Sequence, residues 1–207
     1  MKKNILIIVA VFTIGFANAQ KAEFGVKGGL NVTGFTGDTE GVDLKSKVGF
    51  NIGFFTAIKL SEKFTLQPEI LFSAQGVEMQ NVSANVNGVD YTGDVKFNLS
   101  YINIPVMFKY YITKKINVEA GPQIGFLTSA KSVTKLEGFS QSVEQDAKDY
   151  FESVDFGLNF GAGYDFTNKF SAGIRYNLGL SNIAKTPAGD DSEFRNSVFS
   201  LSLGYKF

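Results

Sequence analysis

Charged side chains recur on the polar faces of segments in which apolar and polar residues alternate. Five acidic and five basic residues occupy these faces: Glu23, Lys27, Lys59, Glu69, Lys109, Glu119, Asp155, Asp165, Arg175 and Lys206. If the polar faces line a narrow interior, each charge requires a partner, because an isolated buried charge is costly. Paired charges that fill the interior are the favoured interpretation. A proton or ion path through the same residues is the alternative.

Arg175 is the expected centre of this charge network. A guanidinium can bind two carboxylates at once, and its planar shape suits bidentate pairing. Arg175 should point into the interior, because its neighbours Ile174 and Tyr176 belong to the apolar face. Its expected partners are Asp155, Asp165 and Glu69, in that order, and Lys109 and Glu119 are expected in the same network.

The composition argues against several kinds of catalysis. The chain contains no His and no Cys, which removes the usual general base of a hydrolytic triad and the usual ligands of zinc. Carboxylates in two polar segments could bind calcium, but neither segment has the spacing of a dedicated calcium loop. These carboxylates are Asp38, Glu40 and Asp43 in the first segment and Asp190, Asp191 and Glu193 in the second. We therefore expect no enzymatic activity, no cofactor and no metal.

The first 19 residues have the pattern of a secretory signal peptide. Lys2 and Lys3 precede an apolar run over 5–16, and Ala17-Asn18-Ala19 matches a cleavage site. The run is shorter than the ~20 residues of a membrane-spanning helix. We therefore predict a signal peptide at 1–19 and one exported domain at 20–207. Without Lys2 and Lys3, the exported domain has a small negative net charge, which gives no electrostatic footprint for nucleic acid.

Three short polar triplets recur along the chain and define the expected architecture. They are Ser61-Glu62-Lys63, Thr113-Lys114-Lys115 and Thr167-Asn168-Lys169, each between two alternating segments. A long polar stretch separates successive triplets, which are about fifty residues apart, and this rhythm is typical of outer-membrane barrels. It predicts an all-β protein, an eight-stranded antiparallel up-and-down transmembrane β-barrel with short periplasmic turns and long extracellular loops.

The period-two pattern gives approximate boundaries for the eight strands. The expected strands are 23–32, 47–60, 64–75, 97–112, 116–129, 153–166, 170–182 and 196–207. The expected long loops are 33–46, 78–96, 130–150 and 184–194. Ser142 and Gln145 resemble a helix-capping pair, which predicts a short helix over 142–150. Pro68, Pro105 and Pro122 fall inside strands, where proline removes a ladder donor, so we expect local bulges there.

The two faces distinguish a membrane barrel from a soluble ligand-binding barrel. The polar face of 153–166 and 170–182 is rich in Gly, Ser and Asn, which suit a narrow lumen, and the opposite face is apolar and aromatic, which suits lipid. Aromatic residues beside the short turns predict an interfacial girdle of Tyr110, Tyr111, Phe166, Phe170, Tyr205 and Phe207. The last strand ends on Phe207, a pattern similar to the terminal signal that the outer-membrane assembly machinery reads.

Several segments carry a family resemblance. They span 24–31, 66–73, 101–106 together with 109–111, and 121–126, and three of them contain the prolines named above. They resemble the outer-membrane β-barrel family of Gram-negative bacteria that is described as porin-like or PorT-like. The resemblance covers essentially the whole of 20–207 and implies no defined catalytic residues. It also implies an acid where Asn103 stands, so the lumenal charge network is expected to differ here.

These observations predict a location and leave two functions open. The first is a non-enzymatic outer-membrane protein with a structural or surface-interaction role and a lumen filled by side chains. The second is a small-solute or ion channel, which the many lumenal glycines would favour, although eight strands leave an interior just filled by side chains. The expected location is the cell outer membrane. The expected partners are outer-membrane lipid, the assembly machinery during biogenesis and an envelope protein, and no nucleic acid.

Overall fold

The computed structural model describes residues 22–38, 43–86, 89–136, 141–185 and 192–207. The predicted signal peptide at 1–19 and the residues Glu40, Asp190 and Asp191 lie outside these ranges. The described elements are β1 (Ala22–Gly37), β2 (Asp43–Lys59), β3 (Phe64–Val86), β4 (Val89–Tyr111), β5 (Ile116–Leu136), β6 (Ser142–Asp146), the 3-10 turn η2 (Lys148–Tyr150), β7 (Val154–Asp165), β8 (Phe170–Gly179) and β9 (Phe194–Lys206). Among them, no helix has the length and apolarity that crossing a membrane requires.

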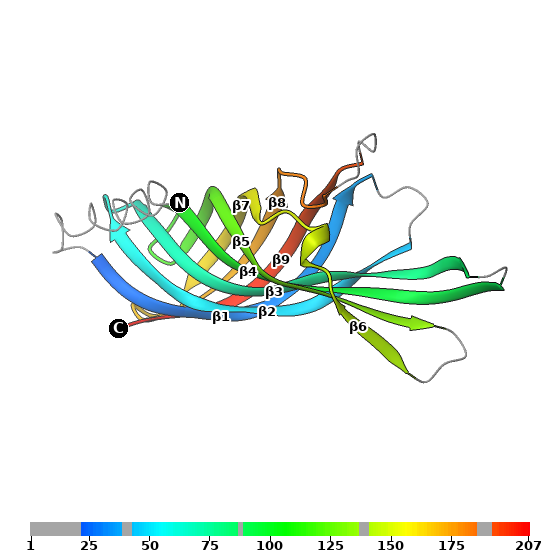
Figure 1. The fold of residues 1–207 in the computed structure, drawn as a ribbon. Helices are drawn as coiled ribbons and strands as arrows, with labels where there is room; N and C mark the ends of the chain where they lie inside the picture. The colour runs from blue at the N-terminus through cyan, green and yellow to red at the C-terminus, as the bar shows by residue number, and fades with distance from the viewer. Residues whose placement is uncertain (1–21, 39–42, 87–88, 137–140, 186–191) are drawn as a thin grey trace.

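Eight of the strands form a closed antiparallel ring (Figure 1). The order is β1–β2–β3–β4–β5–β7–β8–β9, and β9 pairs with β1 from Gly25↔Lys206 to Gly37↔Phe194. Consecutive barrel strands are hydrogen-bonded neighbours throughout, so the topology is up-and-down. The one described strand outside the ring is β6, which pairs with the C-terminal end of β5. The predicted eight-stranded ring is therefore confirmed.

The alternation of side chains follows from strand geometry, in which successive residues point to opposite faces. On β2, Phe50 and Phe54 are exposed on the outside, whereas Asn51 and Phe55 are buried in the lumen. The outer surface of the ring is consequently apolar and the lumen mostly polar. This arrangement inverts that of a water-soluble barrel and suits a lipid environment.

The three short turns share one hydrogen-bonding pattern, which explains the repeated triplets. In the second turn, the Thr113 hydroxyl accepts hydrogen bonds from the backbone N–H groups of Lys115 (3.2 Å) and Ile116 (3.0 Å). Ser61 accepts equivalent bonds in the first turn, and Thr167 does so in the third. A hydroxyl at the first position therefore satisfies donors that a tight turn leaves without backbone partners.

Replacing Thr113 with Val should destabilise the barrel by about 1 kcal/mol, because two backbone donors lose their acceptor while the shape of the side chain is kept. The measurement is urea-induced unfolding of the refolded barrel. Thr113→Ser retains the hydroxyl and should unfold like the unmodified protein. Equal stability of the Val and Ser variants would show that the hydroxyl does not hold the turn.

The long polar segments form hairpins where loops were predicted. β3 and β4 remain paired as far as Val86↔Val89, so the prediction of a loop at 78–96 is wrong. The predicted loop at 130–150 is also wrong, since β5 continues to Leu136 and pairs with β6. The helix predicted over 142–150 is wrong for the same reason: cross-strand pairing satisfies the backbone of 142–146, and only η2 forms a helical turn.

The prolines do not produce the expected bulges. The β3–β4 ladder is interrupted between Pro68 and Leu71 and resumes in the same register, and Pro122 pairs with Leu158 in an unbroken β5–β7 register. Register shifts occur at other places, one of them between Met79 and Val82. A missing donor costs a ladder bond but inserts no residue, and only an inserted residue changes the register.

Aromatic side chains surround the barrel at its short-turn end. The Phe64 and Tyr110 rings lie 5.2 Å apart, and those of Phe170 and Tyr205 lie 4.8 Å apart. Phe166 and Phe207 belong to the same outer belt, packing against Tyr164 and Tyr205. Tyr111 was assigned to this girdle wrongly: it is one residue out of phase with Tyr110, so it points into the lumen, where its hydroxyl donates to Asp165 (3.0 Å).

Deletion of Phe207 should reduce insertion more than shortening of the loop at 184–194. The Phe207 backbone N–H donates to the Phe24 carbonyl oxygen (3.0 Å) at the seam between β9 and β1, and its ring packs on Tyr205. Loops at barrel rims tolerate change better than seam strands do. The measurement is the fraction of each variant recovered folded in the outer membrane. Equal recovery of the two variants would remove the case for a terminal signal at Phe207.

Candidate functional site in the barrel lumen

Arg175 on β8 is buried in the lumen and binds two carboxylates. Its Nη1 and Nη2 donate to Glu69 Oε2 (2.9 Å) and Oε1 (2.8 Å), which is a bidentate pair. Its Nε donates to Glu119 Oε1 (2.9 Å). This is the double pairing expected of a guanidinium, although the carboxylates come from β3 and β5 rather than from the adjoining strand.

Two lysines complete what we call the charge cluster. The ammonium of Lys27 lies 3.5 Å from Glu69 Oε1, and that of Lys109 lies 3.3 Å from Glu119 Oε2. The cluster therefore contains Lys27, Glu69, Lys109, Glu119 and Arg175, contributed by β1, β3, β4, β5 and β8. Because these strands come from all around the ring, the cluster ties opposite walls of the barrel together.

Asp155 and Asp165 are not partners of Arg175, so the predicted order of partners is wrong. Arg175 pairs across strands with Gly161, which is six residues from Asp155, or about 20 Å at ~3.3 Å per residue. Asp155 accepts hydrogen bonds from Asn196 Nδ2 and Ser181 Oγ, both 2.9 Å long. Asp165 accepts from Tyr111. Both carboxylates share the lumenal face of β7 with the residue opposite Arg175, but they lie at other heights in the barrel.

The short-turn mouth of the lumen holds a second set of charges, which we call the mouth pairs. Glu23 lies 2.6 Å from the Lys59 ammonium and 3.3 Å from that of Lys206, and Lys206 lies 3.8 Å from Asp165. An open cavity of about 750 Å³ reaches these residues from the short-turn end. Water therefore reaches the lumen from this side as far as the mouth pairs.

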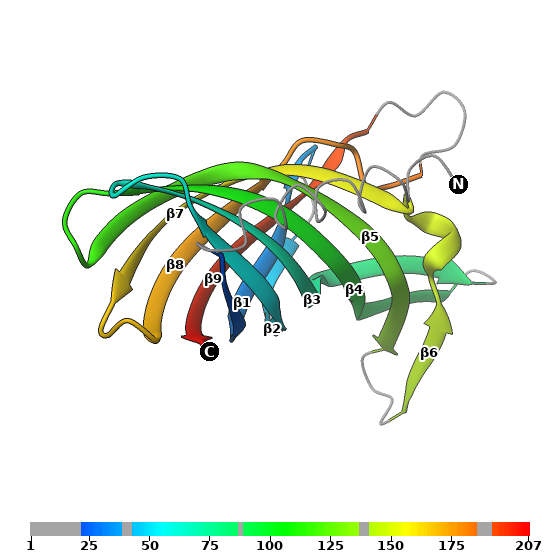
Figure 2. The same cartoon turned by 90° about the vertical axis from the view of Figure 1, so that its left-hand side faces the viewer.

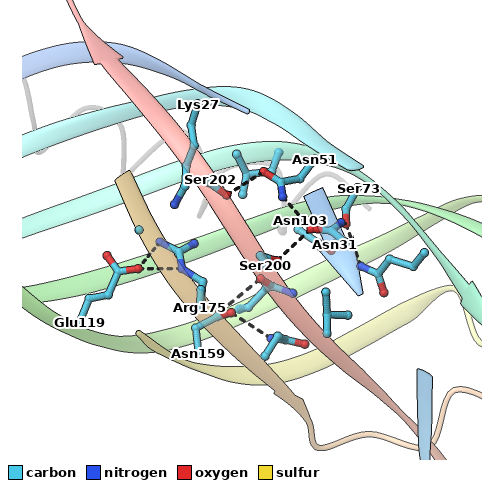
Figure 3. Close-up of a pocket in the computed structure, with 16 residues that line it drawn as sticks. Lys27, Asn31, Asn51, Ser73, Asn103, Glu119, Asn159, Arg175, Ser200 and Ser202 are labelled. Atoms are coloured by element: carbon cyan, nitrogen blue, oxygen red, sulfur yellow. Dashed lines mark hydrogen bonds and ion pairs between the residues drawn. The ribbon is translucent and has the colours of Figure 1, made fainter. Parts of the chain in front are cut away.

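On the other side of the charge cluster, amide and hydroxyl side chains fill the lumen. Asn31 is the centre of this amide layer: it donates to Ser73 Oγ (3.0 Å) and accepts from Asn51 (2.6 Å) and Ser200 (2.9 Å) (Figure 3). A second series of side-chain hydrogen bonds runs from Asn177 through Asn159 to Gln123. A small cavity of about 40 Å³ lies within this layer.

The end of the lumen opposite the three short turns, which we call the long-loop end, is closed by apolar side chains. We call these side chains the apolar cap. Its buried members are Leu99, Tyr101, Leu127, Ala130, Ala147, Phe151 and Ile183. The Phe151 ring packs on Phe97 (5.5 Å between centroids) and on Phe35 (6.4 Å). Two backbone hydrogen bonds hold the segment 147–152 across the mouth. The Ala147 N–H donates to the Ala130 carbonyl oxygen, and the Glu152 N–H donates to the Ile183 carbonyl oxygen.

Sequence reasoning missed the apolar cap because it predicted a long loop over 130–150 with a short helix at 142–150, and it gave no role to Phe151. The signal that could have found the cap is Phe151, a large apolar side chain in the largely polar run 146–153. Ile183, which directly follows the polar pair Ser181-Asn182 at the end of an expected strand, is a second such signal.

The lumenal side chains form ion pairs and hydrogen bonds with one another and could bind a small polar or charged ligand. Among the described residues, no group of three or more His, Cys, Asp or Glu side chains is placed to hold a metal ion. Asp38 and Asp43, which were considered for calcium, accept hydrogen bonds from the Glu193 backbone and the Asn81 side chain. The arrangement is a stack of charged, amide and apolar layers between the two mouths.

Comparison with known proteins agrees with this architecture. The structure is similar to that of Ail, the attachment invasion locus protein of Yersinia pestis, with a TM-score of 0.52 and 12% identity over 90% of this chain and 99% of that chain. It is also similar to Neisserial surface protein A (NspA), with a TM-score of 0.50 and 15% identity over 90% and 99% of the two chains. At these identities the likeness concerns the fold alone. A search of curated protein sequences finds no match.

A family model supplies the assignment that these distant structures cannot. Residues 17–185 match the model described as outer membrane protein beta-barrel domain, which is most of the chain. The apolar outer face, the closed ring and the short turns with their aromatic belt all fit that description. The chain therefore belongs to this family of outer-membrane β-barrel proteins.

Proposed function

We propose that this protein is a non-enzymatic outer-membrane barrel whose lumen does not conduct and whose working surface is the long-loop end. The observation that carries the proposal is the filled lumen, in which the charge cluster, the amide layer and the apolar cap follow one another. Such a barrel is a rigid support for the segments at its rim. In folds of this kind, scaffold and function separate, and the rim varies more freely.

The surface offered at the long-loop end consists of two hairpins. The last pair between β2 and β3 joins Asp43 to Gln80, and β3 and β4 continue together beyond it to Val86 and Val89. β5 continues to form the hairpin with β6. Figure 2 shows both hairpins projecting from the same end of the barrel, beside the turn at η2. They give the protein a structured surface that extends past the ring.

β6 supports an interaction role most directly. All five of its residues are exposed, and it pairs with β5 along one edge. Within the described part of the chain, the other edge of β6 has no strand beside it. An unpaired edge accepts an extended segment from another protein by strand addition. The exposed pair between Lys131 and Glu144 adds little stability, so the hairpin is free to adapt.

The channel alternative is not favoured by the lumenal glycines. A Cβ atom at Gly157 would meet Asn177 Nδ2 at 2.8 Å, and one at Gly163 would meet Asn117 at 2.9 Å. At Gly161 the space is taken by Glu119, with Oε1 at 3.1 Å. These glycines therefore make room for neighbouring side chains and do not open a path.

Planar-bilayer recording tests the closed lumen. We expect the refolded protein to give no steady conductance steps in potassium chloride, because the cavities found in the charge cluster and in the amide layer have volumes of about 30 Å³ and about 40 Å³. Reproducible ohmic steps would contradict the proposal and support the channel. The matched control is the same preparation after boiling, which should also be silent, so that steps present only in the folded sample are attributable to the barrel.

The interaction role is tested separately by photocrosslinking in cells. Val143 on β6 is 57% exposed and should yield adducts with an envelope component when replaced by a photoreactive phenylalanine derivative. The control is the same replacement at Lys63 in the first short turn, on the opposite end of the barrel. Absence of adducts at Val143, or an identical pattern at both positions, would contradict a partner specific to the β5–β6 hairpin.

A further inference from the structure

The charge cluster carries one more positive than negative charge. It contains three cations and two carboxylates, whereas the neighbouring mouth pairs balance, with two of each sign. The lumenal carboxylate that would offset the excess is Asp155, about 20 Å from Arg175 along the strands at ~3.3 Å per residue. Asp155 is instead held by Asn196 and Ser181. The excess positive charge therefore has no compensation at short range.

Lys27 is the cation with the weakest pairing. Its side chain is 13% exposed, and its ion pair among the described residues is to Glu69 Oε1 at 3.5 Å. That oxygen already accepts hydrogen bonds from Arg175 Nη2 and Gln67 Nε2, both 2.8 Å long. An ammonium has three N–H donors. Lys27 thus holds its charge with one long, shared contact, which is costly in a buried site.

The small cavity in the amide layer lies against this ammonium. Its volume is about 40 Å³, and Lys27, Arg175 and Asn103 are among the residues that line it. Figure 3 shows the Lys27 side chain directed towards the Arg175 guanidinium. A space of this size holds one or two water-sized particles.

Asn103 contributes a second donor to the cavity. The residue is 6% exposed and lines the cavity, and no side-chain hydrogen bond between described residues involves its amide. Its polar atoms are not among the fully enclosed atoms without a partner, so the amide faces the cavity, where a bound particle would complete its hydrogen bonding. Glu119 also lines the cavity, but its oxygens are already engaged by Arg175 and Lys109.

We propose that this cavity binds one small monovalent anion, of the size of chloride, between the Lys27 ammonium and the Asn103 amide. The anion neutralises the excess charge of the cluster and satisfies the Asn103 donor. A water molecule does the second but not the first. The buried and unpartnered Gln75 Oε1 needs a donor, so a water suits that end of the same cavity.

The test compares the thermal unfolding of the refolded barrel in sodium chloride and in sodium gluconate at equal ionic strength. Gluconate is too large for the cavity. The midpoint is the temperature at which half of the intensity of the folded band is lost, on a gel of samples that are not boiled before loading. We expect a midpoint several degrees higher in chloride, rising with the logarithm of chloride concentration, because a ligand that binds the folded state stabilises it.

Two variants should abolish this salt difference for opposite reasons. Lys27→Met removes the excess charge, and Asn103→Asp supplies a fixed negative charge in place of the anion. Lys63→Gln, at an exposed lysine in the first short turn, should keep the full difference. Crystals grown in sodium bromide should show an anomalous peak in the cavity. If Lys27→Met fails to fold, Asn103→Asp still decides, because it adds no volume.

Equal midpoints of the unmodified protein in the two salts would overturn the proposal, as would variants that both keep the full chloride effect. A cavity without bromide would overturn it as well. The inference rests on the closed lumen of the proposed function, and the two can fail separately. A conducting barrel is revealed by bilayer recording, whereas a silent barrel without a chloride effect refutes the anion site alone.

Discussion

Replacing Arg175 with Met is expected to destabilise the barrel by about 3–5 kcal/mol, the usual cost of breaking a buried charge pair from one side. The substitution removes three hydrogen bonds, two to Glu69 and one to Glu119. Both carboxylates then remain buried with only Lys27 and Lys109 beside them. The measurement is the free energy of unfolding in urea, with the barrel in lipid or detergent.

A second substitution separates lost pairing from lost packing. Arg175→Met combined with Glu69→Gln should recover part of the loss, because the Glu69 carboxylate that lost its bidentate partner is no longer charged. The matched control is Arg195→Met: Arg195 pairs with Glu193 on the exposed rim, so this change should cost less than about 1 kcal/mol. An Arg175→Met variant that unfolds like the unmodified protein would show that lumenal water already solvates the cluster.

Replacing Phe151 with Ala should destabilise the protein by about 3 kcal/mol, the lower end of the range for a buried phenylalanine. The ring is 5% exposed and packs against Phe97 and Phe35 in the apolar cap. Its removal leaves a cavity at the long-loop mouth that the backbone bonds of the segment prevent from collapsing. Urea unfolding measures the loss.

The adjacent residue provides the control for this prediction. Tyr150 is 68% exposed and contributes a similar ring, so Tyr150→Ala should change the free energy of unfolding by less than about 0.5 kcal/mol. Similar losses for the two variants would mean that the segment, rather than the buried ring, stabilises the mouth. No loss at Phe151 would show that the apolar cap is not part of the folded core.

The parts of the fold that could be predicted are those set by neighbours in sequence. Side-chain alternation is a local property, so the inward direction of Arg175 and the outward direction of Phe50 follow from counting residues. The repeated hydroxyl of Ser61, Thr113 and Thr167 likewise acts on donors two and three residues away. These features need no knowledge of which strand lies beside which.

The partners of Arg175 could not be predicted in the right order, because they depend on the height of each residue in the barrel. Height follows from the register and tilt of all strands between two positions, and no local pattern fixes it. Asp155 lies on β7, next to Arg175's strand, and on the lumenal face, but too far along that strand, whereas Glu69 reaches Arg175 from β3. The β3–β4 and β5–β6 hairpins were missed for a related reason. Their segments are polar in composition, and they form strands because each pairs with a neighbouring strand.

The charge cluster also bears on how the barrel unfolds. Arg175 and Glu69 are 106 positions apart, and Glu119 is 56 positions from Arg175. Contacts of such long range close late, after the intervening strands have been arranged. Interactions absent from the rate-limiting step mainly slow the reverse reaction. We therefore expect the Arg175 contacts to contribute little to the rate of insertion and much to the lifetime of the inserted protein.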